Sequence, residues 1–205
     1  MKKILAWHFT DGLKLRDGQK LIEGKTYTFE GTPKLCMRGY HASRKAIDAL
    51  TYAPGCQISR VELWGKVQED ENKLVAQNCT VLWTADATMI LHEFACQCAE
   101  VALANIKNPD PRSVAAIETK RRWMRGEATD EELSAAQSAA WDAAWEVAQD
   151  AAWSAAQSAA WDAAHDATQS ATWSAAQSAA WSAAWEVAQD ELNACLEALL
   201  AMVGR

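Results

Sequence analysis

Hydrophobic and polar positions follow two different rules in the two parts of the chain. Up to about residue 106, short apolar runs alternate with turns. From Ser134 to Asn193 the chain repeats a four-residue unit that begins with Ser, Asp or Glu and ends mostly in Trp or Gln. Three near-copies of a 20-residue unit follow one another there, at 134–153, 154–173 and 174–193. Such self-similarity indicates an assembly or contact segment rather than a catalytic one.

The first 90 residues carry the alternation and the turn signals that are typical of short strands. Asp11-Gly12 and Asp17-Gly18 are turn signals between apolar runs. The expected strands are Ile4–Phe9, Thr26–Glu30, Gln57–Trp64 with its continuation Gly65–Val67, Lys73–Ala76 and Thr80–Trp83, and a further short apolar run lies at Leu35–Met37.

Helical spacing appears at three places before the repeat. Ser43–Tyr52 has apolar residues on one face and Ser43 as a plausible N-cap. Asp86–Ile106 carries a longer apolar stripe. The linker Asn108–Pro111 follows, and a short basic helix is expected at about Ser113–Arg125. The chain up to residue 106 is therefore expected to be an α+β head domain, with residues 107–128 forming a linker that contains the basic helix.

The remaining segment, residues 129–203, is expected to be a long Ala/Trp-rich helix or a helical bundle. Thr129 and Glu132 form a capping-box pattern at its start, and no Gly or Pro occurs from Glu127 to Val203. Because four residues over-rotate an α-helix by about 40°, the Trp and Gln positions spiral around it and apolar groups appear on all sides. A fold-back into shorter helices is an alternative at Thr168–Thr172, where the residues weaken a helix.

The indoles of this tail are the predicted self-association residues, since a helix that is apolar all round needs neighbours. The alternative is that repeat duplication produced a low-complexity helix in which Trp is only filler. The residues expected to make the contacts are Trp141, Trp145, Trp153, Trp161, Trp173, Trp181 and Trp185.

Charge is divided unevenly along the chain. Residues 1–126 hold 19 Lys and Arg against 14 Asp and Glu, whereas residues 127–204 hold 13 Asp and Glu and no Lys or Arg. An acidic tail argues against direct nucleic-acid binding; the tail could seek a basic partner or dock on its own head. No segment is apolar enough to span a membrane, and the start of the chain does not resemble a signal peptide, so we expect a cytoplasmic protein with its six cysteines reduced.

A few residues could carry chemistry. His8 and His41 lie at expected strand ends, where they could contact a ligand or simply be satisfied by the backbone. His92 and Cys96 have helical spacing that could begin a zinc site, but no second pair of ligands accompanies them, and we expect no metal. The basic segment 120–125 could bind nucleic acid or a membrane surface, or could be a solvated face that pairs with the acidic tail.

A series of short motifs follows one another in a fixed order over about residues 5–100. They are Trp7–Phe9, Leu15–Gly18, Leu35-Cys36, Gly39–Ser43, Asp48–Leu50, Tyr52–Gly55, Arg60–Leu63, Lys73–Ala76 and Thr80–Trp83. In these motifs the chain resembles an uncharacterised family of phage and prophage proteins, whose members often carry a constant N-terminal domain and repetitive tails of varied composition. The resemblance implies no activity.

The same motifs are more distantly similar to the ADP-ribosyltransferase fold, which would place NAD in the head. His8 would match the histidine that holds the NAD ribose, His41 would fall at the position of a Tyr, with Tyr40 beside it, and Tyr52 would match the tyrosine that stacks on nicotinamide. The strand that should supply a catalytic Glu opens at Gln77–Thr80, contains Asn78, and has no Glu. Binding of a nucleotide-like ligand would survive that loss, but transfer chemistry would not. The residues predicted to bind such a ligand are His8, Tyr40, His41, Tyr52 and Asn78.

Together these observations predict a non-enzymatic interaction protein, and the resemblance implies that it is phage-encoded and lies in the cytoplasm of an infected bacterium. The head would bind a nucleotide-like ligand or a host partner, with no obligatory cofactor, and the tail would drive homo-oligomerisation. The alternatives are an ADP-ribosyltransferase-like enzyme that uses NAD, an acidic nucleic-acid mimic, and a structural protein of the virion.

Overall fold

A computed structural model of the chain describes residues 2–143, 146, 190 and 193–202. The chain divides into two compact units, which are described separately below. The first combines Met1–Phe94 with Gln189–Arg205, and the second is Ala95–Ala188. The last stretch of the chain therefore belongs to the same unit as the first 94 residues.

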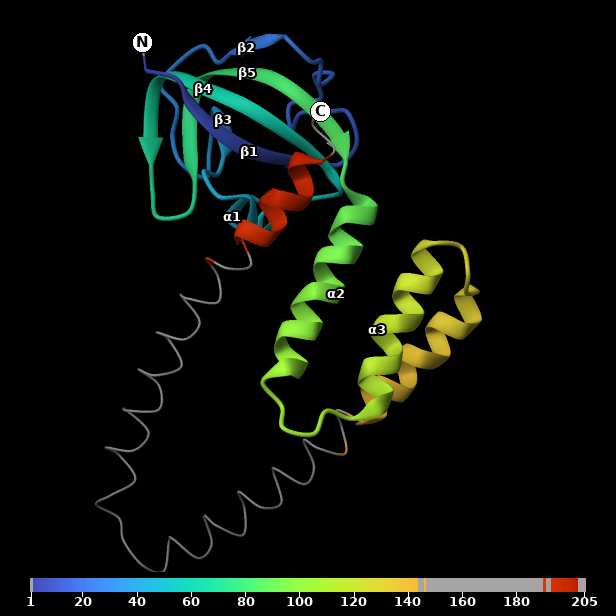
Figure 1. Cartoon of the computed structure of the whole chain (residues 1–205). Coiled ribbons are helices and arrows are strands. Elements are labelled where there is room, and N and C mark those ends of the chain that lie inside the picture. Colours follow the sequence, from blue (N-terminus) through green and yellow to red (C-terminus); the bar gives the residue numbers. More distant parts are fainter. Residues whose placement is uncertain (1, 144–145, 147–189, 191–192, 203–205) are drawn as a thin grey trace, which may run out of the picture. The chain divides into compact units, whose positions relative to one another are not determined.

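The first unit is a mixed α/β domain built on an antiparallel sheet of five strands (Figure 1). Its strands pair in the order β1-β4-β5-β2, and β3 also pairs with β5. The strands are β1 Ile4–Thr10, β2 Thr26–Thr28, β3 Tyr40–Ala42, β4 Gln57–Glu69 and β5 Leu74–Asp86.

Alternating apolar side chains of the sheet form the core of this unit. Val61 and Leu63 of β4 are buried, together with Val81 of β5. Leu15 and Leu21 from the loop before β2 close over the same cluster. Removing this apolar surface from water, at about 25 cal/mol per Å², holds the loop as well as the strands in place.

The long central strands confirm the predicted alternation and correct one detail. The prediction of a strand at Gln57–Trp64 with a continuation is confirmed by β4, which runs to Glu69. The two strands expected at Lys73–Ala76 and Thr80–Trp83 are wrong as separate elements, because β5 continues through both. The polar residues between them stay in the strand because they pair with β4, Asn78 opposite Trp64 in the register.

The apolar run at Leu35–Met37 forms a turn rather than a strand. Lys34 pairs with Arg38 across it, and Cys36 adopts a left-handed backbone with φ of 60°. Such a turn cannot join the sheet ladder. The next strand, β3, follows directly at Tyr40.

Helix α1, Ala46–Thr51, begins later than expected. The predicted N-cap, Ser43, is wrong: its backbone N–H and C=O pair with Trp7 at 3.0 and 2.7 Å, so it lies in an extended strand-like pairing. Lys45 is the N-cap instead and provides no side-chain cap. The backbone donors at the start of α1 therefore depend on other partners.

Helix α2, Thr88–Ala104, lies within the range expected for it, and Asp86 caps its start by accepting a hydrogen bond from the Thr88 N–H at 2.8 Å. Helix α3, Pro111–Met124, begins two residues before the expected start. Proline is favoured at the first helical position because it has no N–H to leave unpaired. Asp110 is its N-cap and accepts from the Arg112 N–H.

Residues 130–143 are helical, and the predicted capping box at their start is confirmed. The Thr129 N–H donates to the Glu132 carboxylate at 2.8 Å, and the Glu132 N–H donates to the Thr129 hydroxyl at 3.2 Å. Trp141 lies on this helix and is 72% exposed. Trp145, Trp153, Trp161, Trp173, Trp181 and Trp185, and with them the prediction of one long helix or a bundle, lie outside the described residues.

Residues 193–201 form a second described part of the tail, which we call the terminal helix. Leu196 and Leu200 on this helix are completely buried. No helix in the described part of the chain is both long and apolar enough to cross a membrane.

Candidate functional site

A cleft of about 950 Å³ opens in the first unit, next to the end of β1. Its walls come from β1, from the loop that follows β1, from the turn before β3, from β3 itself and from the end of α1. The cleft collects four of the five predicted ligand-binding residues: His8, Tyr40, His41 and Tyr52.

The loop after β1 is held by its own short hairpin. Lys14 pairs with Lys20, the Leu15 N–H donates to the Gln19 carbonyl at 2.8 Å, and the buried Leu15 side chain anchors the loop in the core. Arg16 and Asp17 stand at the tip of this hairpin and line the cleft. Backbone pairing and the buried Leu15 side chain together hold this polar loop in place.

The two histidines are both held in the neutral form at pH 7. Burial lowers the pKa of His8 to about 4, and the nearby charge of His41 adds to the lowering, while a hydrogen bond to the His41 backbone opposes it. Burial likewise lowers the pKa of His41, although its Nδ1 lies 3.1 Å from the Gly39 carbonyl. Since a carbonyl only accepts, Nδ1 carries the proton, and Nε2 is left as an acceptor.

His41 Nε2 is buried and has no hydrogen-bond partner among the residues that the structure describes. An unpaired buried polar atom costs about 1–3 kcal/mol, so such atoms are rare unless a function needs them. Because His41 lines the cleft and its Nε2 atom has this unused acceptor, His41 is the strongest candidate for a ligand contact.

Aromatic side chains form the less polar part of the lining. Tyr40 packs at a tilt against Tyr27, with 6.1 Å between the ring centroids, and burial raises the pKa of Tyr40. Tyr52 is half exposed; its hydroxyl donates to Asn72 at 3.0 Å, and the Lys73 ammonium lies 5.2 Å from its ring centroid. An exposed ring fixed at its hydroxyl can stack on a flat ligand.

The lining is net positive. Four cationic side chains line the cleft, against the carboxylates of Asp11 and Asp17 as the only acidic side chains among the described lining residues. Such an excess raises the local concentration of an anionic ligand. These cations, which the sequence reasoning missed, are Lys14, Arg16, Arg38 and Lys73.

Asn78, the fifth predicted residue, does not line the cleft. Its side chain is buried in the sheet, where it accepts from the Thr28 hydroxyl at 2.9 Å and donates to the Trp64 carbonyl at 3.3 Å. The structure therefore gives Asn78 a role in joining β2, β4 and β5.

The basic segment 120–125 in the second unit pairs with carboxylates. Arg121 forms an ion pair with Glu100, Arg122 lies 3.9 Å from Glu132, and Arg125 pairs with Glu127 at 2.7 Å. The prediction that this segment pairs with acidic residues at the start of the tail agrees with the last two of these contacts. Its cations are thus engaged inside the chain.

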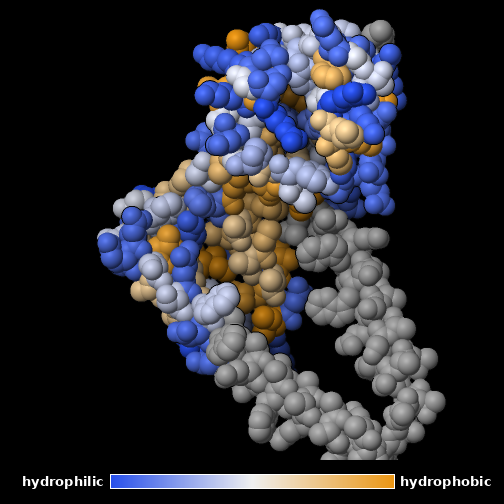
Figure 2. Space-filling model, turned by 180° about the vertical axis from the view of Figure 1, so that it is seen from behind, coloured by the Kyte–Doolittle hydropathy of each residue, from blue (hydrophilic) through white to orange (hydrophobic). Residues whose placement is uncertain are grey.

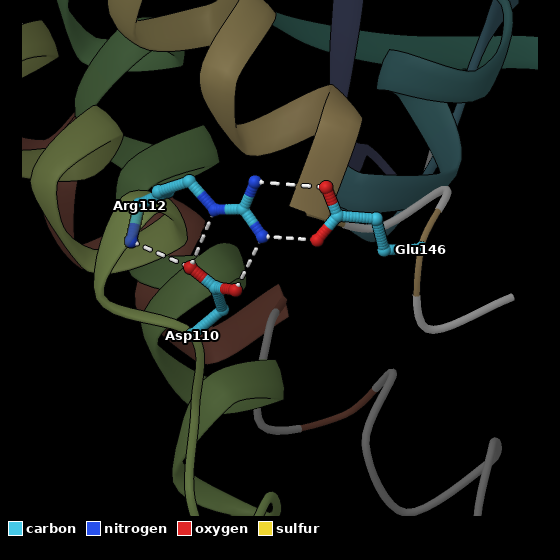
Figure 3. A network of polar contacts seen from close by, with 3 residues as sticks. All are labelled: Asp110, Arg112 and Glu146. Carbon is cyan, nitrogen blue, oxygen red and sulfur yellow. Dashed lines mark hydrogen bonds and ion pairs between the residues drawn. The ribbon is translucent and has the colours of Figure 1, made fainter. Parts of the chain in front are cut away.

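A neighbouring arginine, Arg112, is also paired with carboxylates of the chain (Figure 3). The Arg112 guanidinium donates to the Asp110 carboxylate at 2.9 Å and to the Glu146 carboxylate at 2.6 Å. These hydrogen bonds raise the pKa of Arg112, with Asp110 as the larger cause. Helix α3 is thereby joined to a residue of the repeat.

In the described part of the chain, no group of three His, Cys, Asp or Glu side chains is arranged to hold a metal ion. His92 and Cys96 lie on α2 and have other interactions. Figure 2 shows that the face of α2 turned to the viewer is mostly apolar, and Met89 and Val101 are about half exposed.

Comparison with known proteins adds one match. Residues 5–93 match the family described as a domain of unknown function (DUF7666). The match covers the sheet, α1 and the start of α2, and it is consistent with an uncharacterised family that has a constant N-terminal domain. No curated protein and no solved structure matches the chain.

Proposed function

We propose that the first unit is a non-enzymatic binding domain for an anionic, nucleotide-like ligand. The observation that supports this proposal is the cleft itself, where neutral histidines, aromatic rings and an excess of cations meet. Each of these three groups suits a different part of a nucleotide.

The cations suit the phosphates. Lys14 and Arg16 approach the cleft from one loop, while Arg38 and Lys73 approach from other elements. Arginine and lysine bind phosphate oxygens through charge-assisted hydrogen bonds. A neutral nucleoside would gain nothing from these side chains, so phosphate should decide affinity.

The remaining lining suits the base and the sugar. The exposed ring of Tyr52 offers a stacking surface, and base–aromatic stacking contributes about 1–3 kcal/mol per base in nucleic-acid binding proteins. His41, with one nitrogen donating to Gly39 and the other unpaired, can accept a hydrogen bond from a hydroxyl. The ligand expected from this combination is ADP-ribose or a related nucleotide.

An ADP-ribosyltransferase-like enzyme that uses NAD is the alternative. That chemistry needs a carboxylate that stabilises the developing positive charge on the ribose, and the resemblance assigns it to a Glu. The acidic side chains among the described lining residues are Asp11 and Asp17, and the strand position expected for the Glu holds Asn78 in the sheet. Binding without transfer is therefore the better-supported proposal.

For the tail we propose self-association, in a phage protein that acts in the cytoplasm of its bacterial host. Trp141, which is 72% exposed on helix 130–143, supports a contact role because its indole offers a large apolar surface that a partner could cover. Sedimentation at several concentrations would test this: a monomer at all of them would refute it. Competition with DNA for a basic host protein, or recovery of the chain in purified virions, would instead favour the mimic or the structural alternative.

The proposed ligand class is tested by calorimetric titration of the full chain with ADP-ribose, NAD, ATP and adenosine. We expect the phosphorylated ligands to bind and adenosine to bind at least tenfold more weakly. Arg16→Ala should weaken nucleotide binding, whereas Lys66→Ala, which removes an exposed cation of β4 outside the cleft, should not. Equal binding of adenosine, or equal effects of the two variants, would refute the proposal.

Incubation with NAD distinguishes binding from catalysis. The proposal predicts that NAD binds and is recovered intact. Release of nicotinamide by the full chain, abolished by His8→Ala, would show that the enzyme alternative is right.

A further inference from the structure

Within the first unit, the terminal helix packs against residues 1–94, although its position in the chain does not predict that contact. Leu196 and Leu200 have no exposed surface, although the helix is separated from the sheet by about a hundred residues of chain. In Figure 1 the helix lies beside β1 and α1. Two leucines one turn apart give the helix a short apolar face that is fully used.

Hydrogen bonds to the start of α1 fix the position of the terminal helix on the first unit's sheet and helix α1. The Ala46 N–H donates to Glu197 Oε1 at 3.2 Å, and the Ile47 N–H donates to Asn193 Oδ1 at 3.1 Å. These are the backbone donors that Lys45 leaves uncapped at the start of α1. Side chains from the far end of the sequence thus do the work that a local N-cap residue would do.

A third contact joins the terminal helix to β1 and β4. The Trp7 indole N–H donates to Glu197 Oε1 at 3.2 Å, and the Arg60 guanidinium stacks 4.2 Å above the Trp7 ring. Burial lowers the pKa of Arg60, and the charge of Glu197 opposes the lowering. Glu197 therefore accepts a hydrogen bond from a buried indole and places a negative charge near a half-buried cation.

We infer that the terminal helix is a latch that docks on the surface formed by Trp7, Arg60 and the start of α1, and holds α1 in place. The family match ends at residue 93, so the latch is an addition outside the matched domain. Trp7 lines the cleft, and so do Ala49 of α1 and Tyr52 just after it. Docking of the latch therefore fixes one wall of the cleft.

Helix α1 needs stabilising contacts that residues 1–94 do not supply by themselves. A six-residue helix is too short to be stable by itself, and α1 lacks a side-chain cap from its own N-terminus. The side chains of Asn193 and Glu197 supply the missing hydrogen-bond acceptors, and the buried pair Leu196 and Leu200 supplies apolar contact.

Hydrogen exchange of the full chain tests the latch, with Leu196→Asp as the perturbation and Ala198→Asp as the matched control. Both changes place an aspartate on the same helix, but Leu196 is buried and Ala198 is exposed. Leu196→Asp should speed exchange at residues 46–51 and 193–201 at least tenfold more than it speeds exchange in β5. Ala198→Asp should change none of these segments.

Two results would overturn the inference. Unchanged protection of residues 46–51 in Leu196→Asp would show that α1 does not depend on the terminal helix. Equal acceleration of exchange in β5 and in residues 46–51 would show that the helix is part of the core and not a latch. Leu196→Ala, a smaller change, provides the same comparison if the aspartate variant does not fold.

Discussion

Glu197→Ala should destabilise the first unit far more than removal of another carboxylate nearby. Oε1 of Glu197 accepts hydrogen bonds from Trp7 Nε1, from the Ala46 N–H and from Asn193 Nδ2, at 3.2, 3.2 and 3.3 Å. All three bonds are long, so each is expected at the lower end of the range for bonds to a charged group, about 1.5 kcal/mol. Two of the donors are part-buried groups of the head, so we expect a loss of roughly 2–4 kcal/mol in the free energy of unfolding.

Asp190→Ala is the matched control. Asp190 forms an ion pair with Lys45, but the two side chains are 70% and 50% exposed. Exposed pairs of this kind contribute up to about 1 kcal/mol. Both variants remove a carboxylate near the same docking surface. The hydrogen-bond partners of Glu197 are part-buried, whereas the ion-pair partner of Asp190 is half exposed.

Reactivity of Cys79 reports unfolding of the first unit specifically. Burial in the sheet raises the pKa of the Cys79 thiol to about 12, so the folded protein should not be alkylated there. Pulsed alkylation across a urea series, measured on the Cys79 peptide by mass spectrometry, gives the unfolding midpoint. The midpoint should fall by roughly 1–2 M urea in Glu197→Ala and by much less in Asp190→Ala. Equal midpoints in the two variants would refute the argument from burial.

Three further predictions follow from individual residues. The pKa of His8 is about 4 in the folded state and near 6.5 when unfolded, so its contribution is complete above pH 6.5 and is lost as pH falls towards 4; denaturation at pH 7 and 4.5 should show His8→Gln losing less stability than the parent, by up to about 3 kcal/mol. Gly39→Ala should destabilise the first unit by more than Gly24→Ala in the same urea series, because both glycines have positive φ but only at Gly39 would a Cβ come within 3.0 Å of other atoms; equal losses would contradict this. Thr129→Ala should cost helix 130–143 about 1 kcal/mol and speed amide exchange in its first turn, and unchanged exchange would refute the capping role.

The sheet could be predicted from the sequence because alternation over a long strand is a strong signal. Ile58, Val61 and Leu63 mark β4 clearly. Strand β3 gives no such signal, since it has three residues and only Ala42 is buried. Its place is set by pairing with β5, which a local pattern does not contain.

The candidate site was predictable only in part, for a similar reason. His8 and His41 stand out by residue type at strand ends, and the structure brings both into the cleft. The cations Arg16 and Arg38 lie in turns, where charged residues are ordinary, so nothing in the sequence distinguishes them. The resemblance alone predicts a ligand-binding role for Asn78, whereas its hydrogen bonds join strands of the sheet.

The sequence does not predict whether the terminal helix docks on the rest of the chain. An acidic tail could dock on its head or seek another partner, and the four-residue pattern does not decide between them. The deciding contacts join Glu197 to Trp7 and Ala46, which are at least 150 residues away in the chain. Tertiary contacts over such separations leave no periodic trace.

An NMR titration of the full chain with histidine-labelled rings would test the proposed function most directly. Ligand binding in the cleft predicts that ADP-ribose shifts the ring signals of His8 and His41 in a saturable way. His92, on α2 and outside the cleft lining, is the internal control and should not shift. If ADP-ribose, NAD and ATP all leave the His8 and His41 signals unchanged, or if His92 shifts equally, the cleft is not a nucleotide-binding site.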